Sequence, residues 1–177
     1  MVPLCLDQRQ RPAVLFCVRA EGLRSHAGEI CFPGGRMEPN DADITATALR
    51  EAHEEVGLLA RDIQILGQMS PVLTRGRMAV TPVVGFISGS CPAQSLDPQR
   101  LQIDRREVAA AFTLPLQQLL DPAMRTSYKV TVPRETMPRT VPAFKLTREQ
   151  AASLPYAAGQ ERPPGAPLEE VSVWGMT

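Results

Sequence analysis

Short blocks of apolar residues, separated by polar turns, follow one another along most of this chain. The first two blocks, Val2 to Leu6 and Pro12 to Val18, flank the polar segment Asp7 to Arg11 and predict neighbouring strands joined by a hairpin. Further blocks of strand length and composition are Gly28–Phe32, Ile63–Leu73, Met78–Ser88, Glu107–Leu114, Tyr128–Val132, Val141–Leu146 and Val171–Trp174. The pattern predicts a mixed α/β chain that is rich in strands.

The strongest helical pattern runs from about Asp43 to Val56. Its apolar positions recur on one face, at Leu49, Ala52 and Val56. Either Asp41 or Asp43 is suited to accept hydrogen bonds from the free N–H groups of the first turn. Gly57 is suited to end the helix because glycine adopts positive φ readily. Pro115 to Leu120 predicts a second, short helix that begins with proline.

The chain length of 177 residues suits a single domain over 1–177 with a sizeable core. Pro71 and Pro82 interrupt two apolar blocks, which favours edge positions or bulges. Residues 147–167 are rich in Pro, Gly and Ala and are interpreted as a flexible insertion. The sequence begins inside its first strand, so we expect it to be truncated at this end.

Charge and cysteine content narrow the class of protein. The 19 basic and 19 acidic residues balance, which predicts neither a nucleic-acid partner nor a membrane partner. No apolar run approaches the length of a membrane span. The four cysteines form no CxxC pair, so zinc is disfavoured; we interpret Cys5, Cys17 and Cys31 as small buried hydrophobes. A soluble protein of a reducing, intracellular compartment is the default expectation, and disulfides stay an open alternative.

Three glutamates mark the candidate site. Glu51, Glu54 and Glu55 are spaced i, i+3 and i+4, so they share one face of the predicted helix and repel one another there. A divalent cation would remove that repulsion, and carboxylate oxygens suit Mg²⁺ or Mn²⁺. Judged by spacing alone, three glutamates on one helix face more often form an ordinary solvated surface than a metal site.

A glycine turn lies just before this helix. Gly34 and Gly35 allow close backbone approach, so their backbone can contact a phosphate or a metal. Arg50, next to Glu51, is able to hold the carboxylates or the preceding loop in place by bidentate pairing.

Taken together, residues Gly35 to Leu58 resemble the Nudix box, GX5EX7REUXEEXGU, where U is aliphatic. Arg50-Glu51, Glu54-Glu55, Gly57 and Leu58 match its second half. The resemblance implies an α/β/α sandwich with a mixed sheet, in which the box forms loop–helix–loop. It also implies that Glu51, Glu54 and Glu55 bind Mg²⁺ or Mn²⁺ and support hydrolysis of a nucleoside diphosphate derivative. Asp41 stands where the first box glutamate is expected, and the loop to Arg50 is one residue longer.

The segment before the box is similar to one branch of the family. Arg19-Ala20, Arg24, Gly28 and Phe32-Pro33-Gly34-Gly35 are spaced as RA-x3-R-x3-G-x3-FPGG, which resembles the coenzyme A diphosphatase signature. Its usual LLTxR beginning is only loosely kept. The resemblance implies hydrolysis of coenzyme A or its thioesters to 3′,5′-ADP and 4′-phosphopantetheine. Relatives continue into a final helix after a WGxT-like segment, so we expect truncation at the C-terminal end also.

The resemblance implies roles for single residues. Glu54, Glu55 and Glu107 are the catalytic candidates, and spacing cannot divide metal binding from water activation between Glu54 and Glu55. The substrate-binding candidates are Arg19, Arg24, Gly34, Gly35 and Arg50. For Arg19, Arg24 and Glu107, ordinary strand-end or surface roles are open alternatives. Two other functions of the whole domain also stay open. One is hydrolysis of ADP-ribose, NADH or another nucleoside diphosphate derivative, and the other is nucleotide binding by a Nudix module without catalysis.

Overall fold

A computed structural model describes residues 1–73, 78–88, 95–130, 139–146 and 172–174. The chain divides into two compact units, one covering residues 1–116 and one covering residues 117–175. The prediction of a single domain over 1–177 is not tested by this division, and the predicted insertion at 147–167 lies outside the described residues. No helix among the described residues is long and apolar enough to cross a membrane.

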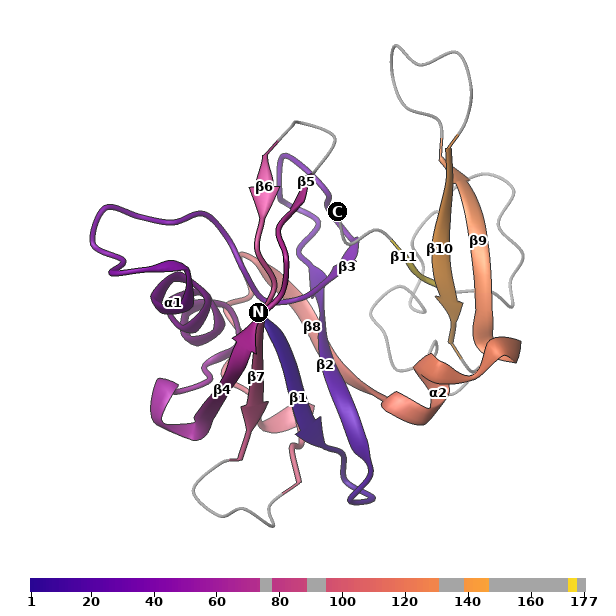
Figure 1. The fold of residues 1–177 in the computed structure, drawn as a ribbon, viewed down its shortest axis with the longest axis horizontal. Helices are drawn as coiled ribbons and strands as arrows, with labels where there is room; N and C mark the ends of the chain where they lie inside the picture. The colour runs from indigo at the N-terminus through magenta and orange to yellow at the C-terminus, as the bar shows by residue number, and fades with distance from the viewer. Residues whose placement is uncertain (74–77, 89–94, 131–138, 147–171, 175–177) are drawn as a thin grey trace. The chain divides into compact units, whose positions relative to one another are not determined.

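The first unit is built on a mixed six-stranded sheet (Figure 1). Its strands are β1 (Val2–Leu6), β2 (Pro12–Arg19), β3 (Ile30–Cys31), β4 (Ile63–Gln68), β7 (Val83–Ile87) and β8 (Val108–Pro115). The order is β3-β2-β1-β7-β4, and β8 pairs with β2. β1 runs parallel to β7, whereas β1 and β2 form the predicted antiparallel hairpin with Leu4 opposite Val14.

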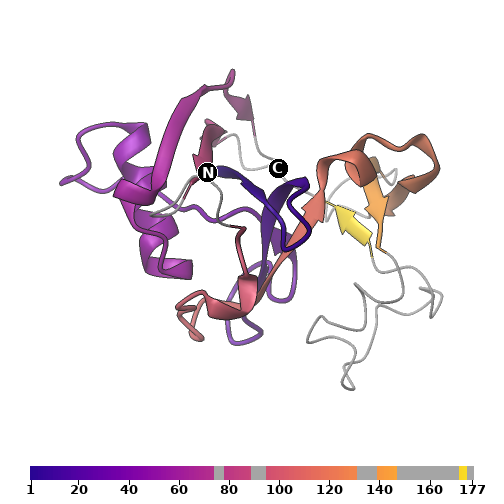
Figure 2. The same cartoon turned by 90° about the horizontal axis from the view of Figure 1, so that it is seen from below.

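Helix α1 (Ile44–Val56) packs against one face of this sheet, as Figure 2 shows from below. Alternate residues of β2 and β1 join the helix in one core, which contains Cys5, Ala13, Leu15, Cys17, Ala48, Ala52 and Val56. Leu15 and Val56 are fully buried, and burial of such a side chain contributes about 1.5–3 kcal/mol. The mixed sheet and the loop–helix–loop confirm the predicted α/β fold class.

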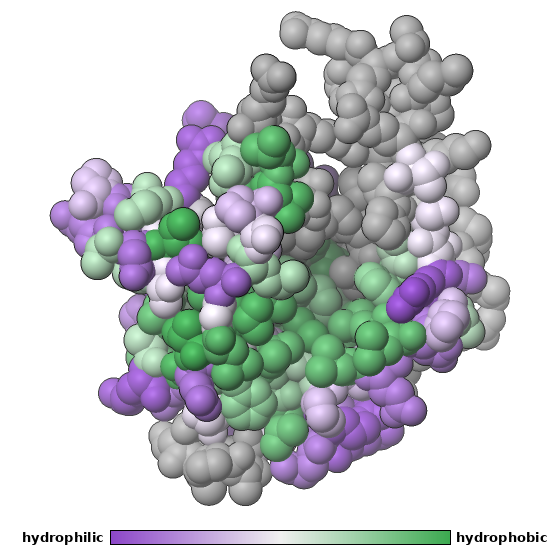
Figure 3. All heavy atoms as spheres, viewed as in Figure 1, coloured by the Kyte–Doolittle hydropathy of each residue, from purple (hydrophilic) through white to green (hydrophobic). Residues whose placement is uncertain are grey.

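The opposite face of the sheet is also apolar. Val14, Phe16 and Val18 of β2 are buried there, so β2 is buried on both faces. Val2, Leu4 and Leu6 of β1 are half-buried. In the space-filling view of Figure 3, apolar residues gather over the central strands, with polar residues at the left and below.

The local signals at the helix ends are confirmed. Asp43, rather than Asp41, is the N-cap, and its side chain accepts a hydrogen bond from the Ala46 N–H at 2.7 Å. Gly57 ends the helix with φ 72°. A Cβ at Gly57 would lie only 2.7 Å from Gln102 Cβ, so the glycine is needed for space as well as for backbone conformation.

Three predicted boundaries differ from the structure. The blocks 63–73 and 78–88 each divide at a proline, because β5 (Val72–Leu73) and β6 (Ala79–Val80) form a separate two-stranded sheet. Where β4 pairs with β7, the register shifts between Ile65 and Gly67. Pro115 ends β8 instead of starting a helix, so α2 spans Leu116–Leu120.

The second unit contains a three-stranded antiparallel sheet. Its strands are β9 (Arg125–Val130), β10 (Arg139–Lys145) and β11 (Ser172–Trp174), in the order β11-β10-β9. The Gln118 side-chain amide donates to the Lys145 carbonyl at 3.3 Å. The remaining short helices in the described part of the chain are the 3₁₀ turns Ala60–Asp62, Pro98–Arg100 and Pro122–Met124.

Candidate active site

The glycine turn packs directly against two carboxylates of α1. The Gly34 N–H donates to Glu55 Oε2 at 3.0 Å, and Glu55 is only 3% exposed. A Cβ at Gly35 would overlap the Glu51 carboxylate, so no other residue fits there without displacing Glu51. The Gly34-Gly35 backbone thus approaches the helix carboxylates closely, and its predicted contact with a phosphate or a metal stays a prediction.

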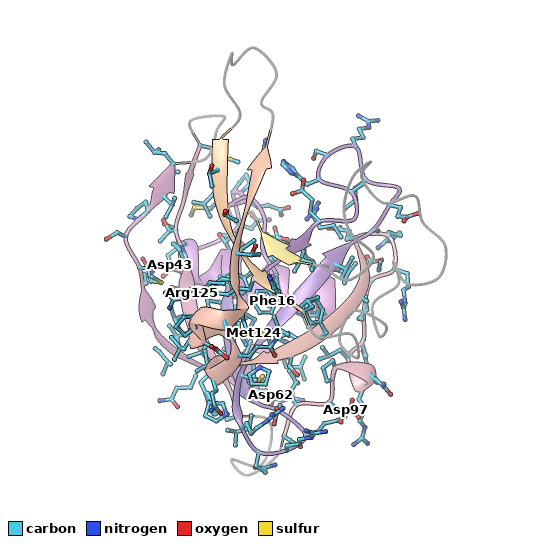
Figure 4. All side chains as sticks on the ribbon, turned by 90° about the vertical axis from the view of Figure 1, so that its right-hand side faces the viewer. Phe16, Asp43, Asp62, Asp97, Met124 and Arg125 are labelled. Carbon is cyan, nitrogen blue, oxygen red and sulfur yellow. The ribbon has the colours of Figure 1, made fainter. Side chains whose placement is uncertain are left out.

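An aromatic row anchors the turn to the sheet. Phe32 stacks on Phe16 with ring centroids 4.9 Å apart, and Phe16 stacks on Phe112 at 5.7 Å. Figure 4 labels Phe16 within the sheet. Pro33, between Phe32 and the glycines, is fully buried. The turn is thus held on both sides, by the stacked rings and by the helix.

Arg50 connects α1 to the preceding loop. Its Nε and Nη2 donate to the two carboxylate oxygens of Asp41, each at 3.0 Å, and its Nη2 donates to the Arg36 carbonyl at 2.9 Å. The same guanidinium pairs with Glu54 at 2.8 Å and with Glu51 at 3.1 Å. The guanidinium therefore ties the loop to the helix while offsetting the repulsion between two of the three glutamates.

Asp41 has a structural role that the sequence left undecided. Besides Arg50, it accepts hydrogen bonds from the Thr47 hydroxyl at 3.0 Å and the Glu38 N–H at 2.8 Å. The hydrogen bonds from Arg50 hold the pKa of the Asp41 carboxyl well below its usual range. The sequence indicated that Arg50 could hold the preceding loop by bidentate pairing, but it did not identify Asp41 as the partner, because the loop geometry that brings Asp41 to Arg50 is not periodic.

The charge of Glu107 acts on two of the helix carboxylates. Burial, as the largest cause, together with the charges of Glu51 and Glu107 raises the pKa of Glu55 to about 7, although the Gly34 N–H and the Arg19 charge oppose this rise. Burial also raises the pKa of Glu51, with Glu54 and Glu107 adding to it and Arg50 opposing it. The structure thus brings Glu107 near the helix carboxylates.

The backbone before β8 fixes the position of Glu107. The Asp104 N–H donates to the Glu55 carbonyl at 3.1 Å, and the Glu107 N–H donates to the Asp104 carbonyl at 3.0 Å. The Glu107 carbonyl accepts from the Ala20 N–H at 2.8 Å. The end of α1, the start of β8 and the end of β2 therefore meet at this point.

The donor set is chemically suited to a hard divalent cation, although its side chains are not gathered as a complete cage. Among the described residues, no three His, Cys, Asp or Glu side chains converge into a metal-binding group. Arg50 holds Glu51 and Glu54, and Gly34 holds Glu55. Mg²⁺ usually takes one or two carboxylates and completes its shell with water and substrate phosphates, so an incomplete cage fits that ion.

The two candidate arginines of the preceding segment differ in their surroundings. Arg24 is exposed in the loop between β2 and β3. Arg19 ends β2, and its Nε is buried without a hydrogen-bond partner among the described residues. The charge of Arg19 lowers the pKa of Glu55, but in the described part of the chain no ion pair or hydrogen bond joins the two side chains.

The three cysteines in the described part of the chain are free, and Cys5 and Cys17 are buried as predicted, whereas Cys31 is partly exposed. Burial raises the pKa of Cys5 to about 12 and that of Cys31 to about 11. These thiols therefore stay protonated at neutral pH, which fits a packing role better than a nucleophilic one.

Comparison of this sequence with known proteins identifies a family and several relatives. A family profile described as NUDIX domain matches residues 1–134. Nudix hydrolase 3 of Caenorhabditis elegans is 39% identical over 138 residues, which cover 77% of this chain and 53% of that protein. An uncharacterized Nudix hydrolase, NudL of Yersinia pestis (strain Pestoides F), is 38% identical over 112 residues, covering 63% and 52%. The chain thus spans about half the length of the curated relatives it matches.

Solved structures agree on the fold. A binary complex of a C. elegans Ap4A hydrolase superimposes with a TM-score of 0.51 at 15% identity, covering 67% of this chain and 80% of that one. The Nudix hydrolase RenU of M. smegmatis gives 0.51 at 20% identity, covering 67% and 69%. The family profile spans the β1–β8 sheet, the glycine turn and the acidic helix, and this protein therefore belongs to the Nudix family.

Proposed function

We propose that this domain hydrolyses the pyrophosphate bond of coenzyme A or an acyl-coenzyme A, with Mg²⁺ or Mn²⁺. The products are 3′,5′-ADP and 4′-phosphopantetheine or its acyl form. The observation that carries the proposal is the contact of the Gly34-Gly35 turn with the Glu51 and Glu55 carboxylates. Family membership supports the broader class, a pyrophosphohydrolase of nucleoside diphosphate derivatives.

Glu51, Glu54 and Glu55 are the residues that would hold the divalent cation. When bound, such an ion lowers the pKa of a water molecule and neutralises charge on the phosphoryl oxygens. Arg50 keeps Glu51 and Glu54 close together and fixes the loop beside them. Glu54, Glu55 and Glu107 are the candidates for taking the proton of the attacking water, and Glu54 is the helix carboxylate most open to solvent.

The segment before the box supplies the argument for coenzyme A. This substrate differs from most nucleoside diphosphate derivatives by its 3′-phosphate, which needs a cationic partner. Arg24 is exposed in the loop that leads into the glycine turn, so its guanidinium is accessible to bind such a phosphate. The backbone of Gly34 and Gly35 lies at the start of the acidic helix, where it can approach the pyrophosphate closely.

A substrate panel tests the proposal. Coenzyme A, acetyl-coenzyme A, ADP-ribose and NADH are each incubated with the protein and with Mg²⁺ or Mn²⁺, and the products are separated by chromatography. We expect 3′,5′-ADP from the first two substrates at a higher kcat/KM than the products of the others. Preferential hydrolysis of ADP-ribose or NADH would overturn the assignment to coenzyme A, and binding without any hydrolysis would indicate a non-catalytic module.

A further inference from the structure

Glu107, one of the catalytic candidates, has a side chain with little to hold it in place. The residue is exposed, and in the described part of the chain its carboxylate makes no hydrogen bond or ion pair. An exposed glutamate without a partner has several rotamers of similar free energy. The backbone at the start of β8 must therefore place this carboxylate beside α1.

A single aspartate closes the backbone turn that leads to Glu107. Asp104 Oδ1 accepts a hydrogen bond from the Arg106 N–H at 3.0 Å, which is the contact of an Asx turn. The Asp104 carbonyl accepts from the N–H groups of Glu107 and Val108, at 3.0 and 2.9 Å. The side chain and the main chain of Asp104 thus fix the backbone over residues 104–107, here called the Asp104 turn.

The Arg106 side chain adds an ion pair to this turn. Its Nη2 donates to Asp104 Oδ2 at 2.7 Å and its Nε donates to Asp104 Oδ1 at 3.0 Å, so the pairing is bidentate. The Arg106 side chain is 88% exposed, and exposed ion pairs contribute little to stability. The hydrogen bond from the Arg106 N–H is therefore the more important contact for the shape of the turn.

The Asp104 turn is attached to the candidate site at both of its ends. At the first end, the Asp104 N–H donates to the Glu55 carbonyl in the last turn of α1, at 3.1 Å. At the second end, the Glu107 carbonyl accepts from the Ala20 N–H at 2.8 Å. A change in the shape of the turn would therefore move Glu107 relative to the helix that carries the other glutamates.

We propose that Asp104 is a positioning residue, whose side chain closes the Asp104 turn and thereby sets the place of the Glu107 carboxylate beside α1. Asp104 acts through Glu107 and touches neither substrate nor metal. The inference rests on the proposed catalytic role of Glu107, but not on the identity of the substrate.

A double-mutant cycle tests the inference in turnover, with whichever substrate the panel identifies. Asp104→Ala should lower kcat by about 10–100-fold with little change in KM, because a displaced catalytic group loses its alignment. In the Glu107→Gln background the same change should lower kcat by no more than about twofold, since the group to be positioned has lost its function. An equal loss in both backgrounds, or wild-type kcat in Glu107→Gln, would overturn the inference.

Two further variants separate the hydrogen bond from a general loss of structure. Asp104→Asn keeps an oxygen that can accept from the Arg106 N–H, so it should restore most of kcat. Asp97→Ala is the matched control, because Asp97 (Figure 4) closes the preceding 3₁₀ turn in the same way, accepting from the Gln99 N–H at 3.0 Å. Its kcat should stay at the wild-type value. A loss in Asp104→Asn or Asp97→Ala as large as that in Asp104→Ala would overturn the role of this hydrogen bond.

Amide hydrogen exchange, measured by NMR, gives a readout that needs neither metal nor substrate. Asp104→Ala should speed exchange of the Glu107 and Val108 N–H groups by about tenfold, whereas Asp97→Ala should leave both unchanged. Wild-type exchange at Glu107 in Asp104→Ala would overturn the inference. Hydrolysis of another panel substrate in place of coenzyme A, or of none, would count against the proposed function, and the exchange rates would still decide whether Asp104 holds the turn.

Discussion

At the scale of single residues, the two glycines of the turn matter both for the contacts that they make and for the space that they leave beside α1. Gly34 offers its N–H to Glu55, and Gly35 leaves room for the Glu51 carboxylate. Both contacts cross from the turn to the helix, so the sequence spacing of the two glycines could suggest close approach but not its partner. The burial of Glu55 could not be predicted from the sequence either, because the helical pattern places Glu55 on the same face as two more exposed glutamates.

Gly35→Ala tests the close approach. The new methyl group would displace the Glu51 carboxylate, so we expect about 10–100-fold lower Mn²⁺ affinity and a reduced kcat, with a smaller effect on folding. The measurements are Mn²⁺ titration, turnover and thermal unfolding. Gly22→Ala is the matched control, because a Cβ at that exposed glycine meets nothing within 4 Å. Equal effects of the two substitutions would contradict the account.

Arg24→Gln tests the assignment of the 3′-phosphate. Loss of one charged hydrogen-bonding partner should raise KM for coenzyme A by about tenfold or more, since such a contact is worth about 1.5–3 kcal/mol. Dephospho-coenzyme A lacks the 3′-phosphate, so its KM should change little. Kinetics with both substrates on the same enzyme preparation provide the comparison, and a similar rise in both KM values would be evidence against the role of Arg24.

At the scale of elements, the loop, the helix and the hairpin hold the candidate site together. Local signals were sufficient for α1, its Gly57 end and the β1–β2 hairpin, and they narrowed the N-cap to Asp41 or Asp43. The parallel pairing of β1 with β7 and the pairing of β8 with β2 join residues far apart in sequence, and no local pattern encodes them. These pairings are what bring Glu107 to the helix.

Asp43 and Asp41 should give separable effects on the helix. Asp43→Ala removes the N-cap and should cost about 1 kcal/mol of stability, with little change in kcat. Asp41→Asn removes the charged partner of Arg50 and should lower both kcat and the unfolding midpoint, because the loop beside Glu51 and Glu54 loses its attachment. Chemical denaturation and turnover of the two variants distinguish these roles. A larger loss of kcat for Asp43→Ala would reverse the assignment.

Asp7 makes the β1–β2 hairpin sensitive to acid. Its carboxylate accepts from the Arg9 and Arg11 N–H groups, each at 2.9 Å, and from Arg11 Nε at 2.8 Å. Burial alone would raise the pKa of Asp7, but these hydrogen bonds and the Arg11 charge lower it. The carboxylate therefore adds stability above the unfolded pKa of about 3.9, and the contribution is lost as pH falls through the lower folded-state pKa.

Asp7→Asn should consequently destabilise the protein by about 1–2 kcal/mol at pH 7 and by less at pH 3. Urea unfolding at both pH values measures the difference from the wild type. Glu21→Gln, which changes an exposed loop carboxylate, is the control. A difference that stays constant between the two pH values would show that the Asp7 charge does not stabilise the hairpin.

At the scale of the whole molecule, the family match over residues 1–134 covers the first unit and reaches β9 of the second. The fold class, the acidic helix and the family could be predicted because they depend on a continuous stretch of sequence. The role of Asp41 could not, because it follows from a loop conformation. The choice of coenzyme A rests on the arginine-containing segment before the box.

The most direct test of the central claim is the hydrolysis of coenzyme A by wild-type protein and by Glu54→Gln and Glu55→Gln, with Mg²⁺ or Mn²⁺. We expect the wild type to release 3′,5′-ADP and 4′-phosphopantetheine in equal amounts. Each variant should lose about 10²–10⁴-fold in kcat while its unfolding midpoint stays close to the wild-type value. Wild-type turnover in either folded variant would contradict a site built on these glutamates.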